Sequence, residues 1–129
     1  MTINFFSQEK YKGGDIVFVK NNSWHFNYIG ILLIENGLPV IYHSDGVVTK
    51  TNLNDFIKGK KYSIKRITEE DFITEDVIIK MHSLAQVNLG LSYNNVSFVW
   101  DIYRQITGLP LCRRDSKSVR NINRNYFLE

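Results

Sequence analysis

Residues 91–108, LSYNNVSFVWDIYRQITG, contain the segment that decides the fold of this chain. Within it, residues 96–107 predict a helix that is apolar around most of its circumference, which is the pattern of a buried helix. Gly108 and Pro110 stop this helix, and Asn94 and Asn95 stand at its start. Asparagine is among the best N-terminal capping residues, so we expect Asn94 or Asn95 to cap this central helix.

The segments before the central helix predict strands and one further long helix. Turn signals at Asn36-Gly37 and Asp45-Gly46 separate apolar or β-branched runs and indicate antiparallel hairpins. A second helix is expected from the N-cap Thr74 to Gly90, with apolar residues at helical spacing. The fold class is therefore α+β, a small antiparallel sheet packed against a buried central helix and a second helix. The expected strands are residues 15–20, 26–35, 38–44, 47–50 and 61–67, with one or two helical turns over 51–58.

Length and composition restrict the class of protein. The 129 residues, 43% of them hydrophobic, suit a single domain over residues 1–129 with its own core. No stretch has the roughly 20 apolar residues that a membrane-spanning helix needs. The single cysteine, Cys112, excludes an internal disulfide and a thiolate metal cluster, and the chain start lacks the order of a secretory signal. We therefore expect an intracellular (cytoplasmic) or virion location.

Seven short motifs occur in an order that is similar to a known family. They are GDIVF at 14–18, YIGI at 28–31, VIYHS at 40–44, GV at 46–47, LNDF at 53–56, LGLSY at 89–93 and FVWDIY at 98–103. In this order they resemble the circularly permuted papain-like fold of the NlpC-type superfamily. The branch concerned includes lecithin retinol acyltransferase-like proteins, bacterial permuted peptidases and a poxviral family. The resemblance covers a core of about residues 13–111 and leaves a basic C-terminal tail, residues 112–129.

The resemblance implies three site positions, and two of them carry the wrong residue for catalysis. Active members have a nucleophilic cysteine at the start of the buried helix, which corresponds here to Asn95. Their histidine corresponds to Tyr28, and the residue that orients it corresponds to His43. An asparagine amide has no proton to ionise near neutral pH, and a tyrosine with a pKa near ~10 is a poor base there. We therefore expect a non-catalytic papain-like domain, a structural or binding component of a viral particle or other assembly.

A hydrolase with an unconventional site is the alternative, as a cysteine peptidase, an amidase or an acyltransferase-like enzyme. Its nucleophile would be Cys112 or Ser97, although Ser97 more simply supports the helix start. His25 is a candidate displaced base, but three residues along a strand from Tyr28 it would face the other side. His82 is expected to face solvent or to lie at the margin of its helix. The three histidines have no metal-ligand spacing, so neither a metal nor another cofactor is expected.

Positive charge gathers in the tail of this otherwise nearly neutral chain, whose net charge is +3. A second alternative is therefore a small adaptor that docks an acidic protein partner through this basic strip. A nucleic-acid backbone is a further candidate partner, but no aromatic residues alternate with the cations as base stacking requires. The basic strip consists of Arg113, Arg114, Lys117, Arg120 and Arg124, opposed only by Asp115.

The basic strip makes a testable prediction. Replacing Arg113, Arg114, Lys117 and Arg120 together with glutamine should weaken binding of an anionic partner. The loss should be greatest at low salt, because screening already weakens exposed charge pairs at high salt. Titrating the parent and the variant with the partner at two salt concentrations measures this loss of affinity. An affinity that stays the same would leave the strip as a solubilising tail.

Overall fold

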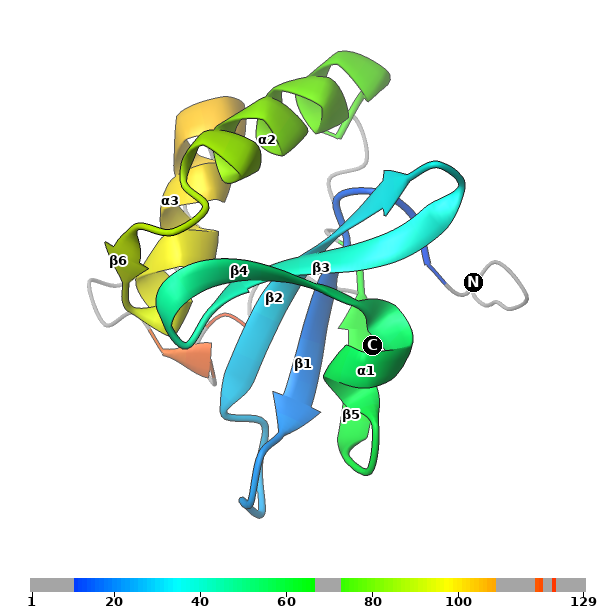
Figure 1. Cartoon of the computed structure of the whole chain (residues 1–129), viewed down its shortest axis with the longest axis vertical. Helices are drawn as coiled ribbons and strands as arrows, with labels where there is room; N and C mark the ends of the chain where they lie inside the picture. Colours follow the sequence, from blue (N-terminus) through cyan, green and yellow to red (C-terminus); the bar gives the residue numbers. More distant parts are fainter. Residues whose placement is uncertain (1–10, 67–72, 109–117, 120–121, 123–129) are drawn as a thin grey trace.

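The computed structural model describes residues 11–66, 73–108, 118–119 and 122. This part of the chain forms an α+β fold with six strands and three helices, shown in Figure 1. All pairings in the sheet are antiparallel, and the strand order is β5-β1-β2-β3-β4-β6. The strands are β1 (Ile16–Lys20), β2 (Tyr28–Glu35), β3 (Leu38–Ser44), β4 (Gly46–Asn52), β5 (Lys61–Lys65) and β6 (Ser92–Tyr93); the helices are α1 (Leu53–Ile57), α2 (Glu75–Val87) and α3 (Asn95–Thr107).

Tight turns produce the two predicted hairpins from β2 to β4. At the β2–β3 turn, Asn36 and Gly37 both have positive φ, 54° and 79°, as a two-residue hairpin loop requires. Several bounds differ from expectation, including two in this run of hairpins. The second strand begins at Tyr28 rather than at residue 26, because the Asn27 side chain instead bonds the backbone of Asn21 and closes a loop. The fourth is longer than residues 47–50 and runs directly into α1.

The sequence pattern predicted neither the position of the outer strand β5 nor the presence of the outer strand β6. β5 returns to the far side of β1, with Lys20 opposite Lys61, so the strand order does not follow the chain order. β6 was not predicted, and it adds to the other edge of the sheet by pairing Gly46 with Tyr93. A two-residue strand has too little pattern to be recognised in a sequence, and only its partner strand identifies it.

Each face of the sheet carries its own core. On one face, side chains such as Phe18, Ile31 and Tyr42 pack with the buried residues of α2 and α3. On the other face, Val17, Leu32 and Ile41 pack beneath α1, whose Leu53 and Phe56 are buried. Figure 1 shows α2 and α3 on one side of the sheet and α1 on the other. Alternation along each strand therefore divides the apolar residues between the two layers.

The prediction of a buried central helix is confirmed for α3. Phe98, Val99, Trp100, Ile102 and Tyr103 are all buried, and the helix packs on both β2 and α2. Its C-terminus is Gly108, which has a φ of 75° and donates its backbone N–H to the carbonyl of Arg104. A left-handed residue at this position is what glycine supplies most easily.

Asn94 is the residue that caps α3. Its side-chain oxygen accepts hydrogen bonds from the backbone N–H groups of Val96 and Ser97, at 3.0 and 3.1 Å. Replacing Asn94 with alanine should therefore lower the free energy of unfolding by about 0.5–2 kcal/mol. Chemical denaturation followed by circular dichroism measures this change, and Asn94→Ser, which keeps a capping oxygen, is the matched control. A loss from Asn94→Ser equal to that from Asn94→Ala would contradict the capping role.

The second helix begins as predicted, with Thr74 accepting from the N–H of Val77. His82 was expected at the helix margin, and its side chain is 25% exposed, but it also hydrogen-bonds the Glu35 carboxylate at 2.6 Å. The same carboxylate accepts from the Tyr42 hydroxyl and from Lys50, so it ties α2 to β2, β3 and β4. This contact was not predicted, because Glu35 and His82 lie 47 residues apart.

Part of the C-terminal tail packs against the fold. Val119 and Ile122 are buried in the same core as α3. Two apolar residues three apart place one side of a helical turn against the core, and the Ile122 N–H donates to the Ser118 carbonyl. The basic strip residues Arg113, Arg114, Lys117, Arg120 and Arg124 lie outside the described residues, as does Cys112.

Candidate functional site

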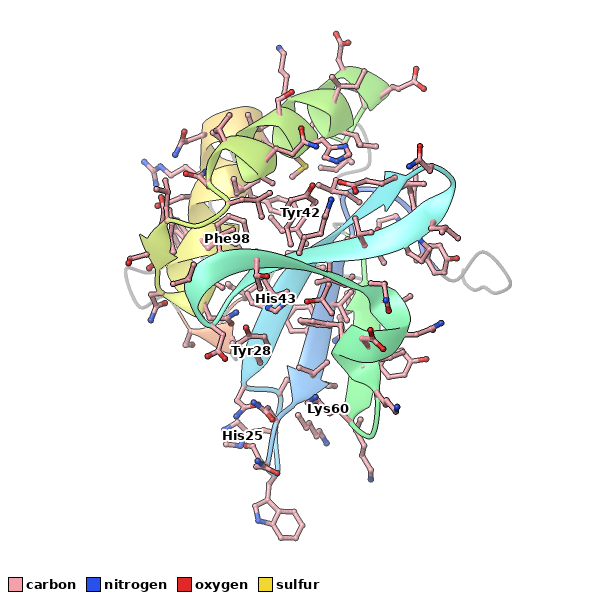
Figure 2. The ribbon with its side chains drawn as sticks, in the orientation of Figure 1. His25, Tyr28, Tyr42, His43, Lys60 and Phe98 are labelled. Atoms are coloured by element: carbon pink, nitrogen blue, oxygen red, sulfur yellow. The ribbon has the colours of Figure 1, made fainter. Side chains whose placement is uncertain are left out.

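The structure brings the three predicted site positions together at one end of the sheet. Tyr28 is the first residue of β2, His43 is the second-last residue of β3, and Asn95 is the first residue of α3. Tyr28 and His43 lie side by side in Figure 2, and a 2.8 Å hydrogen bond joins the phenol oxygen to Nδ1 of the imidazole. Residues that are far apart in the sequence therefore share one site.

Asn95 joins the helix to two strands. Its Oδ1 accepts from the N–H of Ile29 at 3.0 Å, and its Nδ2 donates to the carbonyls of Ile29 and Ser44 at 2.9 and 3.1 Å. The β2–β3 register ends at Ile31 opposite Tyr42, so these backbone groups lie beyond the paired part of the two strands. Buried backbone polar groups need partners, and the Asn95 amide supplies them where the strands separate. The Asn95 amide therefore has a structural role, connecting α3 to β2 and β3.

Both ring nitrogens of His43 already have partners. Nδ1 bonds the Tyr28 hydroxyl, and Nε2 lies 2.8 Å from Oγ1 of Thr51. The residue is 9% exposed, and burial lowers the pKa of its imidazole to about 4, although the Asp45 carboxylate acts in the opposite direction. His43 is therefore neutral at pH 7, with one nitrogen donating and the other accepting. A ring held in this way has no free nitrogen for a substrate proton.

Tyr28 is a proton donor in this arrangement. Burial, reinforced by the negative charge of Asp45, raises its pKa to about 12, and the Asn95 side chain acts in the opposite direction. The phenol therefore keeps its proton throughout the physiological range and cannot serve as a general base there. It can donate one hydrogen bond, to His43 or to a bound molecule.

Close packing holds the two rings in place. The Phe56 ring contacts the His43 ring at a centroid distance of 4.8 Å and the Tyr28 ring at 5.8 Å. Gly30 lies beneath them on β2, where a Cβ would overlap Ile41 Cγ2 and come within 3.2 Å of His43 Cβ. Only glycine allows this approach of β2 to β3 and α1. The Tyr-Ile-Gly-Ile motif thus includes a residue required for packing around the site.

A cleft of about 230 Å³ lies beside the two rings. Asp45, Asp55 and Lys60 give it charges of both signs. Sequence reasoning missed its residues from α1 and β4, above all Thr51 and Phe56. The hairpin turn at Asp45-Gly46 was the available signal, because its register places Thr51 opposite Ile41 and on the same face as His43. The complete lining is Val19, Asn21, Tyr28, His43, Asp45, Thr51, Asp55, Phe56 and Lys60; Asn95 is not part of it.

The remaining candidates lie elsewhere or outside the described residues. His25 is exposed in the loop between β1 and β2 and is not on the strand that carries Tyr28. Ser97 lies in the first turn of α3, where its N–H donates to the Asn94 cap. Among the described residues, no three histidine, cysteine or acidic side chains gather in a metal-ligating cluster. No helix in the described ranges has the length and apolar character needed to cross a bilayer.

Comparison with known proteins gives a likeness of fold. No protein-family model matches the chain, and a search of curated proteins finds no match. Among solved structures, the chain is similar to one described as the metalloprotein yiiX from Escherichia coli O157:H7, with a TM-score of 0.70. The two chains are 21% identical, and the match covers 81% of this chain and 71% of the other. At that level of identity the similarity establishes the fold alone.

Proposed function

We propose that this chain is a non-catalytic member of the permuted papain-like NlpC-type superfamily, acting as a structural or binding component of a larger assembly. One observation carries the proposal. At the position where the resemblance requires a nucleophilic thiol, the Asn95 amide makes three hydrogen bonds to the backbone of β2 and β3. A group fully engaged with the backbone of its own fold has a structural role, and an amide cannot be ionised to a nucleophile.

The other two site positions support the same proposal. Tyr28 keeps its proton at neutral pH, and His43 is neutral with both nitrogens hydrogen-bonded, so neither is available to activate a nucleophile. Removing one member of a nucleophile–base pair costs several orders of magnitude in rate, and here both members are replaced. For the same reason we propose no metal-dependent reaction at His43, because a ligating nitrogen would first have to give up one of these bonds.

The first experiment exposes the purified chain to a thiol-directed acyl probe and to a peptide-like substrate. We expect labelling at Cys112 alone and no turnover, and Cys112→Ser should abolish the labelling. Turnover that disappears in Cys112→Ser, Ser97→Ala or His43→Ala would contradict the proposal and indicate a hydrolase with an unconventional site. Each variant is compared with the parent chain by far-ultraviolet circular dichroism, so that unfolding is not mistaken for inactivity.

The second experiment tests the family relationship by rebuilding the site. In a Cys112→Ser background, Asn95→Cys places a single thiol at the start of α3, and adding Tyr28→His supplies the imidazole that the resemblance requires. A helix N-terminus and a nearby imidazole both favour the thiolate, so the double variant should be alkylated roughly tenfold faster at pH 7 than Asn95→Cys alone. Equal rates in two folded variants would argue against a papain-like arrangement at these positions.

A further inference from the structure

The sheet pairing gathers lysines and exposed aromatic rings at one end of the molecule. The loop of residues 21–27 joins β1 to β2, and residues 58–60 join α1 to β5. Because β1 pairs with β5, with Lys20 opposite Lys61, these two connections lie at the same end of the sheet. Figure 2 shows His25 and Lys60 at this end. We call Lys20, Trp24, Lys58, Lys60, Lys61 and Tyr62 the cationic tip.

Trp24 is presented to the outside by a well-defined loop. Its side chain is 96% exposed, more than any other exposed large hydrophobic residue in the described ranges. The loop is closed at its neck, where the Asn27 side chain accepts from the Asn21 N–H at 2.7 Å and donates to the Asn21 carbonyl at 3.0 Å. Inside the loop, Asn22 takes a left-handed conformation with a φ of 54°. These contacts hold the loop while leaving the indole without cover, although tryptophan has a large apolar surface to bury.

The charged residues of these two connections and of the strand ends beside them are all lysines. Residues 20–28 and 57–62 contain four lysines and no aspartate or glutamate. Lys58 and Lys61 are exposed, Lys20 lies over the Phe26 ring, and Tyr62 adds a second aromatic side chain that is 48% exposed. The neighbouring carboxylates, Asp45 and Asp55, line the cleft beside Lys60. The cationic tip therefore combines an exposed indole with four lysines at the same end of the sheet.

We propose that the cationic tip docks on the surface of an anionic phospholipid bilayer. In that position the Trp24 indole enters the interfacial region, which favours tryptophan and tyrosine, and the lysines reach lipid phosphates. A single indole at the end of a projecting loop suits insertion into a soft surface. Single-stranded nucleic acid is instead bound on successive stacking rings along a groove. This inference does not depend on the proposed function of the Asn95 site.

Sedimentation with phosphatidylcholine vesicles, with and without phosphatidylserine, tests the proposal on the full chain. We expect binding to the phosphatidylserine vesicles alone, lost at high salt because screening weakens the lysine contacts. Trp100 is buried, so a shift of tryptophan fluorescence to shorter wavelength on vesicle addition reports Trp24. The shift should vanish in Trp24→Ala.

Substitutions at the cationic tip give the expected magnitudes. Trp24→Ala should weaken vesicle binding about tenfold. Lys58→Gln with Lys61→Gln should weaken vesicle binding about thirtyfold. Each lysine near an anionic surface contributes roughly a fivefold increase in affinity, and the two contributions multiply. The matched controls are Leu38→Ala, for an exposed apolar residue, and Lys12→Gln with Lys80→Gln, for two exposed lysines away from the tip. These controls should bind as the parent does.

Several outcomes would overturn the proposal. Absence of binding to phosphatidylserine vesicles would do so, and so would equal binding of the tip variants and the parent. Binding that is lost only when Arg113 and Arg114 are replaced would assign the vesicle contact to the C-terminal strip instead. Binding of a single-stranded oligonucleotide without vesicle binding would assign the tip to nucleic acid. All substituted tip residues are exposed, and circular dichroism checks that each variant is folded.

Discussion

Replacing Asn95 with alanine should lower the free energy of unfolding by about 3 kcal/mol, clearly more than replacing its neighbour Asn94. The variant leaves the Ile29 N–H and the carbonyls of Ile29 and Ser44 without the partner that the amide provides. Each buried polar group that loses its partner costs about 1–3 kcal/mol. Asn95 is only half-buried, so water can hydrogen-bond some of the groups that lose the amide. The expected total therefore lies well below the sum of three such costs at the upper end of their range.

Urea denaturation measures the effect, with the midpoint expected to fall at an unchanged dependence on denaturant concentration. Asn95→Asp is a sharper variant, because it keeps an acceptor for the Ile29 N–H but directs a carboxylate at two carbonyl oxygens. It should be at least as destabilising as Asn95→Ala. Asn94→Ala, which removes only the helix cap, is the matched control at the adjacent position. A loss from Asn95→Ala no larger than that from Asn94→Ala would show that the strand contacts contribute little.

His43 should make the fold sensitive to mild acid. Burial holds its folded-state pKa at about 4, below the usual value of 6.5, so the unfolded chain binds a proton more readily between these limits. A side chain of this kind contributes its full stability above pH 6.5 and loses it as the pH falls toward 4. A shift of this size corresponds to about 3 kcal/mol between pH 7 and pH 4.

The measurement compares the pH dependence of unfolding in the parent with that in His43→Gln. The glutamine variant should show a flatter dependence between pH 6.5 and pH 4, whatever its stability at pH 7. Asn94→Ala, which changes stability without changing a titratable group, is the control and should keep the parent's slope. Equal slopes in His43→Gln and the parent would contradict the prediction.

Two carboxyl groups also make the stability of the fold depend on pH. Hydrogen bonds from Tyr42, His82 and Lys50, together with the charge of Lys50, overcome the effect of burial and lower the pKa of Glu35 to about 2. Its contribution is therefore present above pH 4.5 and is lost between pH 4.5 and pH 2. Burial raises the pKa of Asp15 despite its pairing with Arg66, so Asp15 acts with the opposite sign. Neither is altered in His43→Gln, and the difference between the two curves isolates the histidine.

The sequence by itself determined the local elements of this protein. The two ends of α3 are examples, because each depends on residues within a few positions of one another. Asn94 caps its start, and Gly108 ends it. The Asn36-Gly37 turn is equally local, since positive φ at two successive residues is a property of the residues that occupy the turn. Such features are readable because the interactions that favour them are completed within a short segment.

Only the tertiary structure decided what the site residues do. The sequence marked Asn94 and Asn95 as equivalent candidates for the cap, and the bonds that distinguish Asn95 reach 66 residues back along the chain. The engagement of both His43 nitrogens depends on how β2, β3 and β4 align, and the cationic tip exists because β5 returns to the edge of β1. Contacts between distant segments result from packing of the whole chain, so no short pattern specifies them.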